Sequence, residues 1–141
     1  MRLVRWLPLC LLPLLAACID DRIAYESAEG SQVITIVREQ HYIWDESLDL
    51  SLVVSRMPDC SRRHALGKGT ARTRVELWQY RPDTFVVKVG ERMFATETRT
   101  CEGLEKLSAE PPGGMGALLG SFVDKDGKLA FIAVPAKPAA Q

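Results

Sequence analysis

Histidine and serine are the side chains in this sequence that most directly offer catalytic chemistry. The chain has two histidines, His41 and His64, and eight serines. A Ser–His–Asp site needs a histidine beside a nucleophilic serine and an orienting carboxylate. No serine lies in a Gly-x-Ser-x-Gly sequence, and Gly120-Ser121-Phe122 falls within a strand-like run, where a bend or bulge is expected. The sequence therefore predicts no catalytic residue and no enzymatic activity.

Metal and cofactor sites also lack a sequence pattern. Residues 124–127 (DKDG) begin like a calcium loop, but the twelfth position, which carries a bidentate glutamate in EF-hands, is Pro135. A hairpin turn is expected there instead. Cys60 and Cys101 are isolated and have no Cys-x-x-Cys partner, so they do not resemble a zinc site or a redox pair. We predict no metal and no cofactor.

A run of basic residues is the strongest local charge feature. Such a run suits an anionic partner, for example lipid phosphates, peptidoglycan carboxylates or an acidic protein surface. The favoured interpretation is a solvated loop whose arginines keep an edge strand soluble. Both interpretations stay open for this candidate patch, which consists of Arg62, Arg63, His64, Lys68, Arg72 and Arg74.

The composition narrows the class of protein. The chain has 141 residues, of which 47% are hydrophobic and 26% charged, which excludes global disorder and allows one domain. The 18 Lys and Arg balance the 18 Asp and Glu. Zero net charge gives no electrostatic basis for nucleic-acid binding, so none is predicted.

The N-terminus has the pattern of a secretory signal. Arg2 and Arg5 precede an apolar run, residues 6–15, which is too short to span a bilayer core of about 30 Å as a helix. The run ends in Leu15-Ala16-Ala17-Cys18. This sequence resembles the bacterial lipobox, an aliphatic residue and two small residues before the cysteine that is acylated. The resemblance covers residues 1–18 only, and no family is recognised for the rest of the chain.

The resemblance implies a lipid-anchored protein. Cys18 would become the first mature residue and carry two or three acyl chains, each contributing about 0.8 kcal/mol per buried CH₂, which holds a protein on a membrane permanently. Residue 19 is isoleucine, whereas aspartate after the cysteine signals inner-membrane retention in well-studied Gram-negative bacteria. The expected location is the cell envelope of a Gram-negative bacterium, on the periplasmic face of the outer membrane.

The resemblance also assigns a different role to each part of the cysteine set. Cys10 leaves with the signal and Cys18 takes the lipid. Cys60 and Cys101 remain in an oxidising compartment, so a structural Cys60–Cys101 disulfide is predicted.

The rest of the sequence has β patterning. Residues 48–56 alternate, with Leu48, Leu50, Leu52 and Val54 on one face. Pro82 and Gly90 supply turn signals between later runs. The expected strands are residues 32–38, 48–56, 72–80, 85–89, 92–101, 117–123 and 128–134.

These runs predict an all-β domain, a small antiparallel sandwich or a meandering barrel of six to seven short strands with one disulfide. The expected organisation is a signal peptide over 1–17, a lipidated tether over 18–31, the β domain over 32–134 and a disordered tail over 135–141. A loop is expected over 57–71, and a helical turn followed by a loop over 102–116.

Two aromatic clusters stand out. Residues 41–44 (HYIW) either continue the preceding strand or begin another, and residues 78–80 (WQY) lie in a strand. Aromatic side chains on strands usually pack in the core, as we expect here. An exposed face shared by Tyr42, Trp78 and Tyr80 would instead mark a binding groove.

The sequence thus favours a non-enzymatic lipoprotein that binds or braces another envelope component, either a protein or a glycan. The alternative is an inhibitor or ligand-binding module, because the chain is similar in size, anchor and β content to the periplasmic lysozyme inhibitors. Their Ser-Gly-containing inhibitory loop is not found here, so no residue role is carried over.

Overall fold

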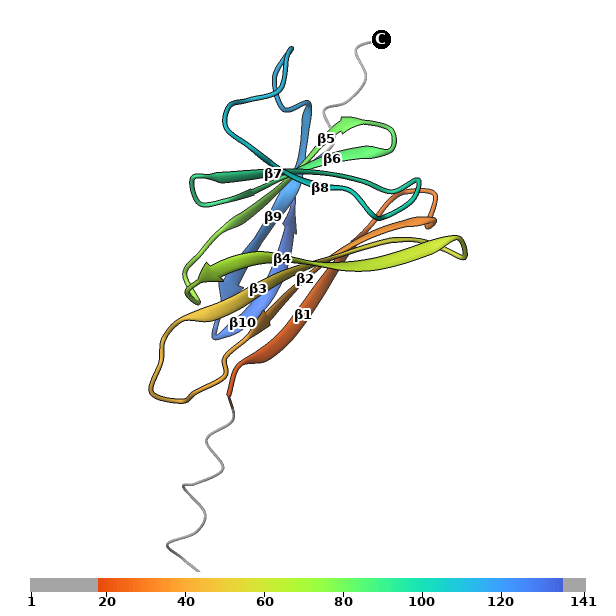
Figure 1. The fold of residues 1–141 in the computed structure, drawn as a ribbon. Coiled ribbons are helices and arrows are strands. Elements are labelled where there is room, and N and C mark those ends of the chain that lie inside the picture. The colour runs from red at the N-terminus through yellow and green to blue at the C-terminus, as the bar shows by residue number, and fades with distance from the viewer. Residues whose placement is uncertain (1–17, 136–141) are drawn as a thin grey trace, which may run out of the picture.

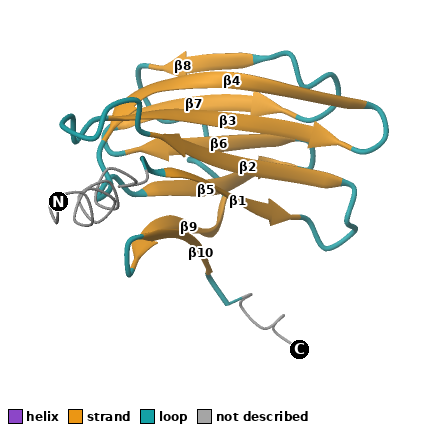
Figure 2. Cartoon of the chain, turned by 90° about the horizontal axis from the view of Figure 1, so that it is seen from below, coloured by secondary structure: helices purple, strands orange, loops and turns teal. Residues whose placement is uncertain are grey.

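The computed structural model describes residues 18–135, which form two antiparallel β-sheets without a helix (Figures 1 and 2). The all-β prediction is confirmed, and the two separate sheets form a sandwich rather than a closed barrel. The expected signal peptide (1–17) and all of the expected tail beyond Pro135 lie outside the described residues. The strands are β1 (Asp20–Glu26), β2 (Gln32–Glu39), β3 (Leu48–Arg56), β4 (Cys60–Gly69), β5 (Val75–Arg81), β6 (Thr84–Val89), β7 (Arg92–Glu97), β8 (Leu104–Leu107), β9 (Ala117–Lys125) and β10 (Lys128–Ala133).

The first sheet has the order β1-β2-β3-β4, and each strand pairs with its neighbour in sequence. The second has the order β10-β9-β5-β6-β7-β8. Here β9 returns to pair with β5, so Val75 lies opposite Phe122. A register shift beside Gly120 confirms the expected irregularity. Gly120 has no room for a side chain, since a Cβ there would lie 2.4 Å from the ring of Phe131.

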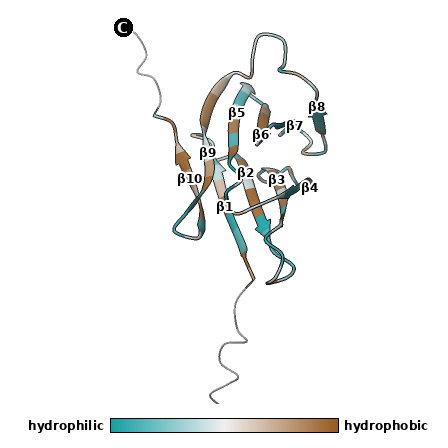
Figure 3. Ribbon diagram, turned by 90° about the vertical axis from the view of Figure 1, so that its left-hand side faces the viewer, coloured by the Kyte–Doolittle hydropathy of each residue, from teal (hydrophilic) through white to brown (hydrophobic). Residues whose placement is uncertain are grey.

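Alternation in the strands builds the core between the sheets. Leu48, Leu50, Leu52 and Val54 of β3 are all buried, as their spacing predicts. Opposite them the second sheet contributes Leu77, Phe85, Val87, Phe94 and Phe122, among others. Hydrophobic colouring is concentrated within strands such as β9 and β10 (Figure 3).

Three predicted segments differ from the structure. Residues 18–31 are not an irregular tether, because Asp20–Glu26 form β1, and every residue of β1 pairs with a residue of β2. The expected loop over 57–71 contains β4, the longest strand, and the expected helical turn after residue 102 is β8. Residues 18–135 therefore contain ten strands, three more than the seven expected runs.

Candidate functional site

Cys18 lies at one end of the sandwich, which we name the N-terminal end. Its thiol is free and exposed. The next residue, Ile19, accepts a hydrogen bond from Gln40 N–H at 2.7 Å, and Asp20 already pairs with Glu39. The predicted acylation position is therefore joined to the first strand by a single residue, beside the loop that connects β2 to β3 (Figure 1).

That loop, residues 40–47, exposes the first aromatic cluster. The prediction that residues 41–44 form a strand and pack in the core is wrong. Tyr42, Ile43 and Trp44 are 54%, 60% and 79% exposed, and the two aromatic rings stack with centroids 5.2 Å apart. Trp78 and Tyr80 lie on β5 and are only partly exposed.

Hydrogen bonds hold this loop in one shape. The Gln40 side chain donates to the Asp45 carbonyl at 2.7 Å, and Asp45 N–H donates to the Tyr42 carbonyl at 3.1 Å. Ser47 N–H donates to the Asp45 carboxylate at 2.9 Å, and the hydrogen bonds from Ser47 lower the pKa of that carboxyl. The exposed tip is therefore presented by an ordered loop.

An open cleft of about 450 Å³ lies at the same end of the sandwich. It separates the chain entering β1 from the connection between β4 and β5. Its lining is formed by Ile19, Gln40, Glu46, Thr70, Ala71 and Arg72.

Next to this cleft, a buried arginine joins the two sheets and donates a hydrogen bond to the carbonyl of Ala71 in the cleft lining. Arg38 is 1% exposed and donates two hydrogen bonds to the Asp21 carboxylate, at 2.8 and 2.7 Å. It also contacts Asp124 of β9 at 3.2 Å. Burial acts to raise the pKa of Asp21, but the hydrogen bonds from Arg38 and from Leu129 N–H outweigh it, so the pKa lies below its usual value.

Sequence reasoning missed this network. Arg38 is the last in-facing residue of β2, after Ile34 and Ile36. The available signal was the alternation of Asp21, Ile23 and Tyr25, which places an aspartate on the in-facing side of β1.

The six residues of the candidate basic patch are divided between different surroundings. On β4, Arg63 contacts Glu39 at 2.6 Å and Ser51 at 3.1 Å on the outer side of the first sheet. Its neighbours Arg62 and His64 point to the segment around the disulfide, where they contact Glu102 and the Cys101 carbonyl. These three side chains do not form one continuous cationic surface.

The other three basic residues lie nearer the N-terminal end. Lys68 contacts Asp49 at 2.7 Å, and its hydrogen bond is the main cause that lowers the pKa of that carboxyl. His41 contacts the second oxygen of Asp49 at 2.5 Å. Arg74 donates to Ser121, and Arg72 is exposed at the cleft. Whether any of them binds an anion stays a prediction.

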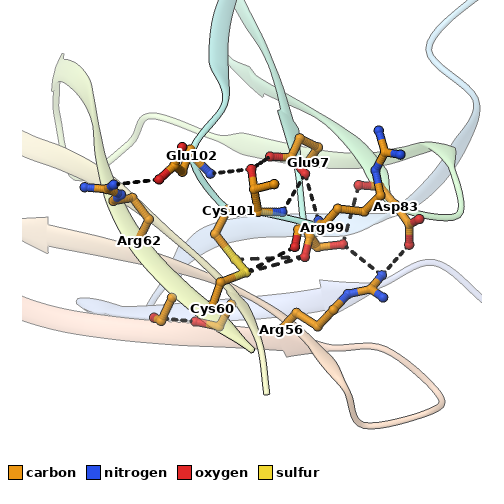
Figure 4. The surroundings of a disulfide bond; sticks show 12 residues. Arg56, Cys60, Arg62, Asp83, Glu97, Arg99, Cys101 and Glu102 are labelled. Atoms are coloured by element: carbon orange, nitrogen blue, oxygen red, sulfur yellow. Dashed lines mark hydrogen bonds and ion pairs between the residues drawn. A yellow bond between two sulfur atoms is a disulfide. The ribbon is translucent and has the colours of Figure 1, made fainter. Parts of the chain in front are cut away.

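The opposite end of the sandwich holds the disulfide (Figure 4). Cys60 at the start of β4 is bonded to Cys101, with Cα atoms 5.9 Å apart, which confirms the predicted pairing. Cys101 has a φ of 62° at the end of a tight turn. The Glu97 carboxylate accepts hydrogen bonds from Arg99 N–H and from both Thr100 N–H and its hydroxyl, which fixes this turn.

A polar cleft of about 340 Å³ lies at this disulfide end, between the β1–β2 and β5–β6 turns. Asp83 is paired with Arg56 and also accepts from Gln32 at 3.1 Å. Arg56 Nε is the one buried side-chain polar atom of residues 18–135 without a hydrogen-bond partner. Polar side chains that line the cleft, among them Glu29 and Asp83, can hydrogen-bond a polar ligand or a partner's main chain.

No cluster of three or more metal-ligating side chains occurs over residues 18–135. The same range contains no helix of the length and hydrophobicity needed to cross a bilayer. Comparison with protein-family models, with curated protein sequences and with solved structures finds no match to this chain.

Proposed function

We propose that this protein is a lipoprotein of the Gram-negative cell envelope, held on the periplasmic face of the outer membrane by acylated Cys18. Its sandwich binds or braces another envelope component, a protein or a glycan, and catalyses no reaction. The observation that carries the proposal is the sequence Leu15-Ala16-Ala17-Cys18, whose cysteine has an exposed thiol immediately before the first strand.

The disulfide end supports the binding part of the proposal. It lies at the far end of the strands from Cys18, so a partner in the periplasm would meet it first. It offers the polar cleft around Arg56 and the exposed Met57 at the β3–β4 turn.

Intact mass of the membrane-extracted protein, with and without reductant, tests the anchor. We expect a chain that begins at an acylated Cys18 and gains two hydrogens on reduction of Cys60–Cys101, about 2 Da. An uncleaved or unacylated chain would overturn the proposal, including its location.

Site-specific photo-crosslinking in intact cells tests the partner. A crosslinker at Met57 should capture an envelope protein or glycan strand. The matched control is Asp126, which is exposed in the β9–β10 turn. This turn lies at the N-terminal end, because Leu129 just after it hydrogen-bonds Asp21 of β1. If the acylated protein gives no Met57 adduct beyond that of the control, the disulfide end is not the binding surface.

A further inference from the structure

The exposed tip of the loop over residues 40–47 lies outside the hydrophobic core. Among the described residues, six large hydrophobic side chains are strongly exposed, and three of them are the consecutive Tyr42, Ile43 and Trp44. The loop's hydrogen bonds keep these side chains exposed instead of letting them fold back. Exposed apolar groups held in this way mark a contact surface.

We propose that Tyr42, Ile43 and Trp44 insert into the interface of the bilayer that carries the acylated Cys18. This inference deepens the proposed function and rests on it. Tyr and Trp prefer the headgroup level of a membrane, because their rings are apolar with one polar group. Ile43 between them reaches towards the acyl chains.

The position of the loop identifies the bilayer as its partner. Gln40, where the loop begins, hydrogen-bonds Ile19 through both its N–H and its side-chain oxygen. Ile19 directly follows Cys18, so acyl chains on that cysteine would bring the loop to the membrane surface. A protein partner in the periplasm would have no such access to this end.

A second contact also changes what the anchor does. Acyl chains on one flexible residue fix the distance of a domain from the membrane but leave it free to rotate. A rigid aromatic tip beside the anchor gives a second point of contact, so the sandwich would hold one orientation with its disulfide end outward.

Tryptophan fluorescence in vesicles tests the contact. Acyl chains already make membrane binding effectively permanent, so affinity is uninformative and depth must be measured. After cleavage before Cys18, the only tryptophans are Trp44 and Trp78. The acylated protein, with its mass verified, is reconstituted into phosphatidylethanolamine–phosphatidylglycerol vesicles whose acyl chains are brominated near the headgroup or near the methyl end.

Trp78→Phe isolates Trp44, and Trp44→Phe isolates Trp78 as the matched control. We expect shallow bromines to quench Trp44 about twofold, deep bromines to quench it less, and neither to quench Trp78. If Trp78→Phe fails to fold, the difference between the wild-type and Trp44→Phe spectra reports Trp44 directly, since Trp44 is exposed.

The outcomes separate the two proposals. An acylated protein whose Trp44 is not quenched overturns the membrane contact and leaves the lipoprotein proposal standing. The same holds if Trp44 crosslinks to a protein in cells instead. A mass without acyl chains overturns both.

Discussion

Arg38 shows what a single charged residue does between two sheets. Its guanidinium is buried against the carboxylates of Asp21 and Asp124, which come from different sheets. Removing the cation leaves two partly buried carboxylates side by side, and breaking a buried ion pair in this way is strongly destabilising. Arg38→Met should lower the free energy of unfolding by about 3 kcal/mol in urea titrations.

The matched control is Arg63→Met, which removes the exposed ion pair between Arg63 on β4 and Glu39. Glu39 follows Arg38 at the end of β2. Exposed ion pairs contribute only about 0–1 kcal/mol. Equal stability of the two variants would show that the network does not hold the sheets together.

Glu97 gives the molecule a predictable response to acid. Burial acts to raise its pKa, but hydrogen bonds from Thr100 and the Arg99 and Gly103 amides lower it from the usual 4.5 to about 2. A carboxyl whose pKa is lower in the folded than in the unfolded state stabilises the fold above the unfolded pKa, and this stabilisation is lost as the pH falls.

The loss should therefore occur between pH 4.5 and about 2. In Glu97→Gln, the thermal midpoint should fall less steeply over this interval than in the wild type. The control Glu105→Gln removes an exposed carboxyl on β8 and should keep the wild-type slope. Parallel curves for all three proteins would contradict the role assigned to Glu97.

These residue-level features were hard to predict from sequence. The spacing of Leu48, Leu50, Leu52 and Val54 identifies a buried face, because alternation is a local property. The partners of Arg38 are 17 and 86 residues away, and nothing local specifies them. The cysteine pairing was predictable only because elimination left a single choice.

At the scale of elements, β1 is the main departure from prediction. Ile23 and Tyr25 pack against the core on one face, while Ala24 between them is exposed. Ile23→Ser should therefore cost about 1–2 kcal/mol of unfolding free energy, and Ala24→Ser about 0.5 kcal/mol or less. If both substitutions were neutral, this segment would be a tether after all.

The sequence signal for β1 was weak because the strand begins with three consecutive charged residues, Asp20, Asp21 and Arg22. Charged side chains of this kind are common on edge strands. Strand β4 was also not predicted, because its local sequence signals indicated a loop. Pro58, Gly67 and Gly69 favour a loop, but pairing with β3 from Arg56 to Leu48 overrides that local preference.

The disulfide joins two elements that do not pair as strands. It connects the start of β4 to the turn after β7, across the two sheets. Closing a segment of 41 residues removes conformational freedom from the unfolded chain, so Cys60→Ala with Cys101→Ala should lose roughly 4 kcal/mol. Urea unfolding of this variant and of the reduced wild type should agree. A loss well below 1 kcal/mol would contradict this estimate.

At the scale of the whole molecule, no linker separates Cys18, the proposed acylation position, from the sandwich. A single residue, Ile19, separates Cys18 from β1, so proteases find no flexible segment there. If the protein is acylated, trypsin should leave the sandwich in the membrane pellet. A Gly/Ser-rich insertion carrying one arginine between Ile19 and Asp20 should release it. Equal release of the two proteins would argue against a strand that begins at the anchor.

The pairing of β9 with β5 has a consequence for the order of folding. The first sheet needs only hairpins between successive strands, and such short-range contacts form quickly. In the second sheet, β5 pairs with β9, which begins at Ala117 and is separated from β5 in the chain by β6, β7 and β8. The long-range closure of β9 onto β5 is expected to limit the folding rate, so substitutions in β9 should slow refolding more than equally destabilising ones in β1.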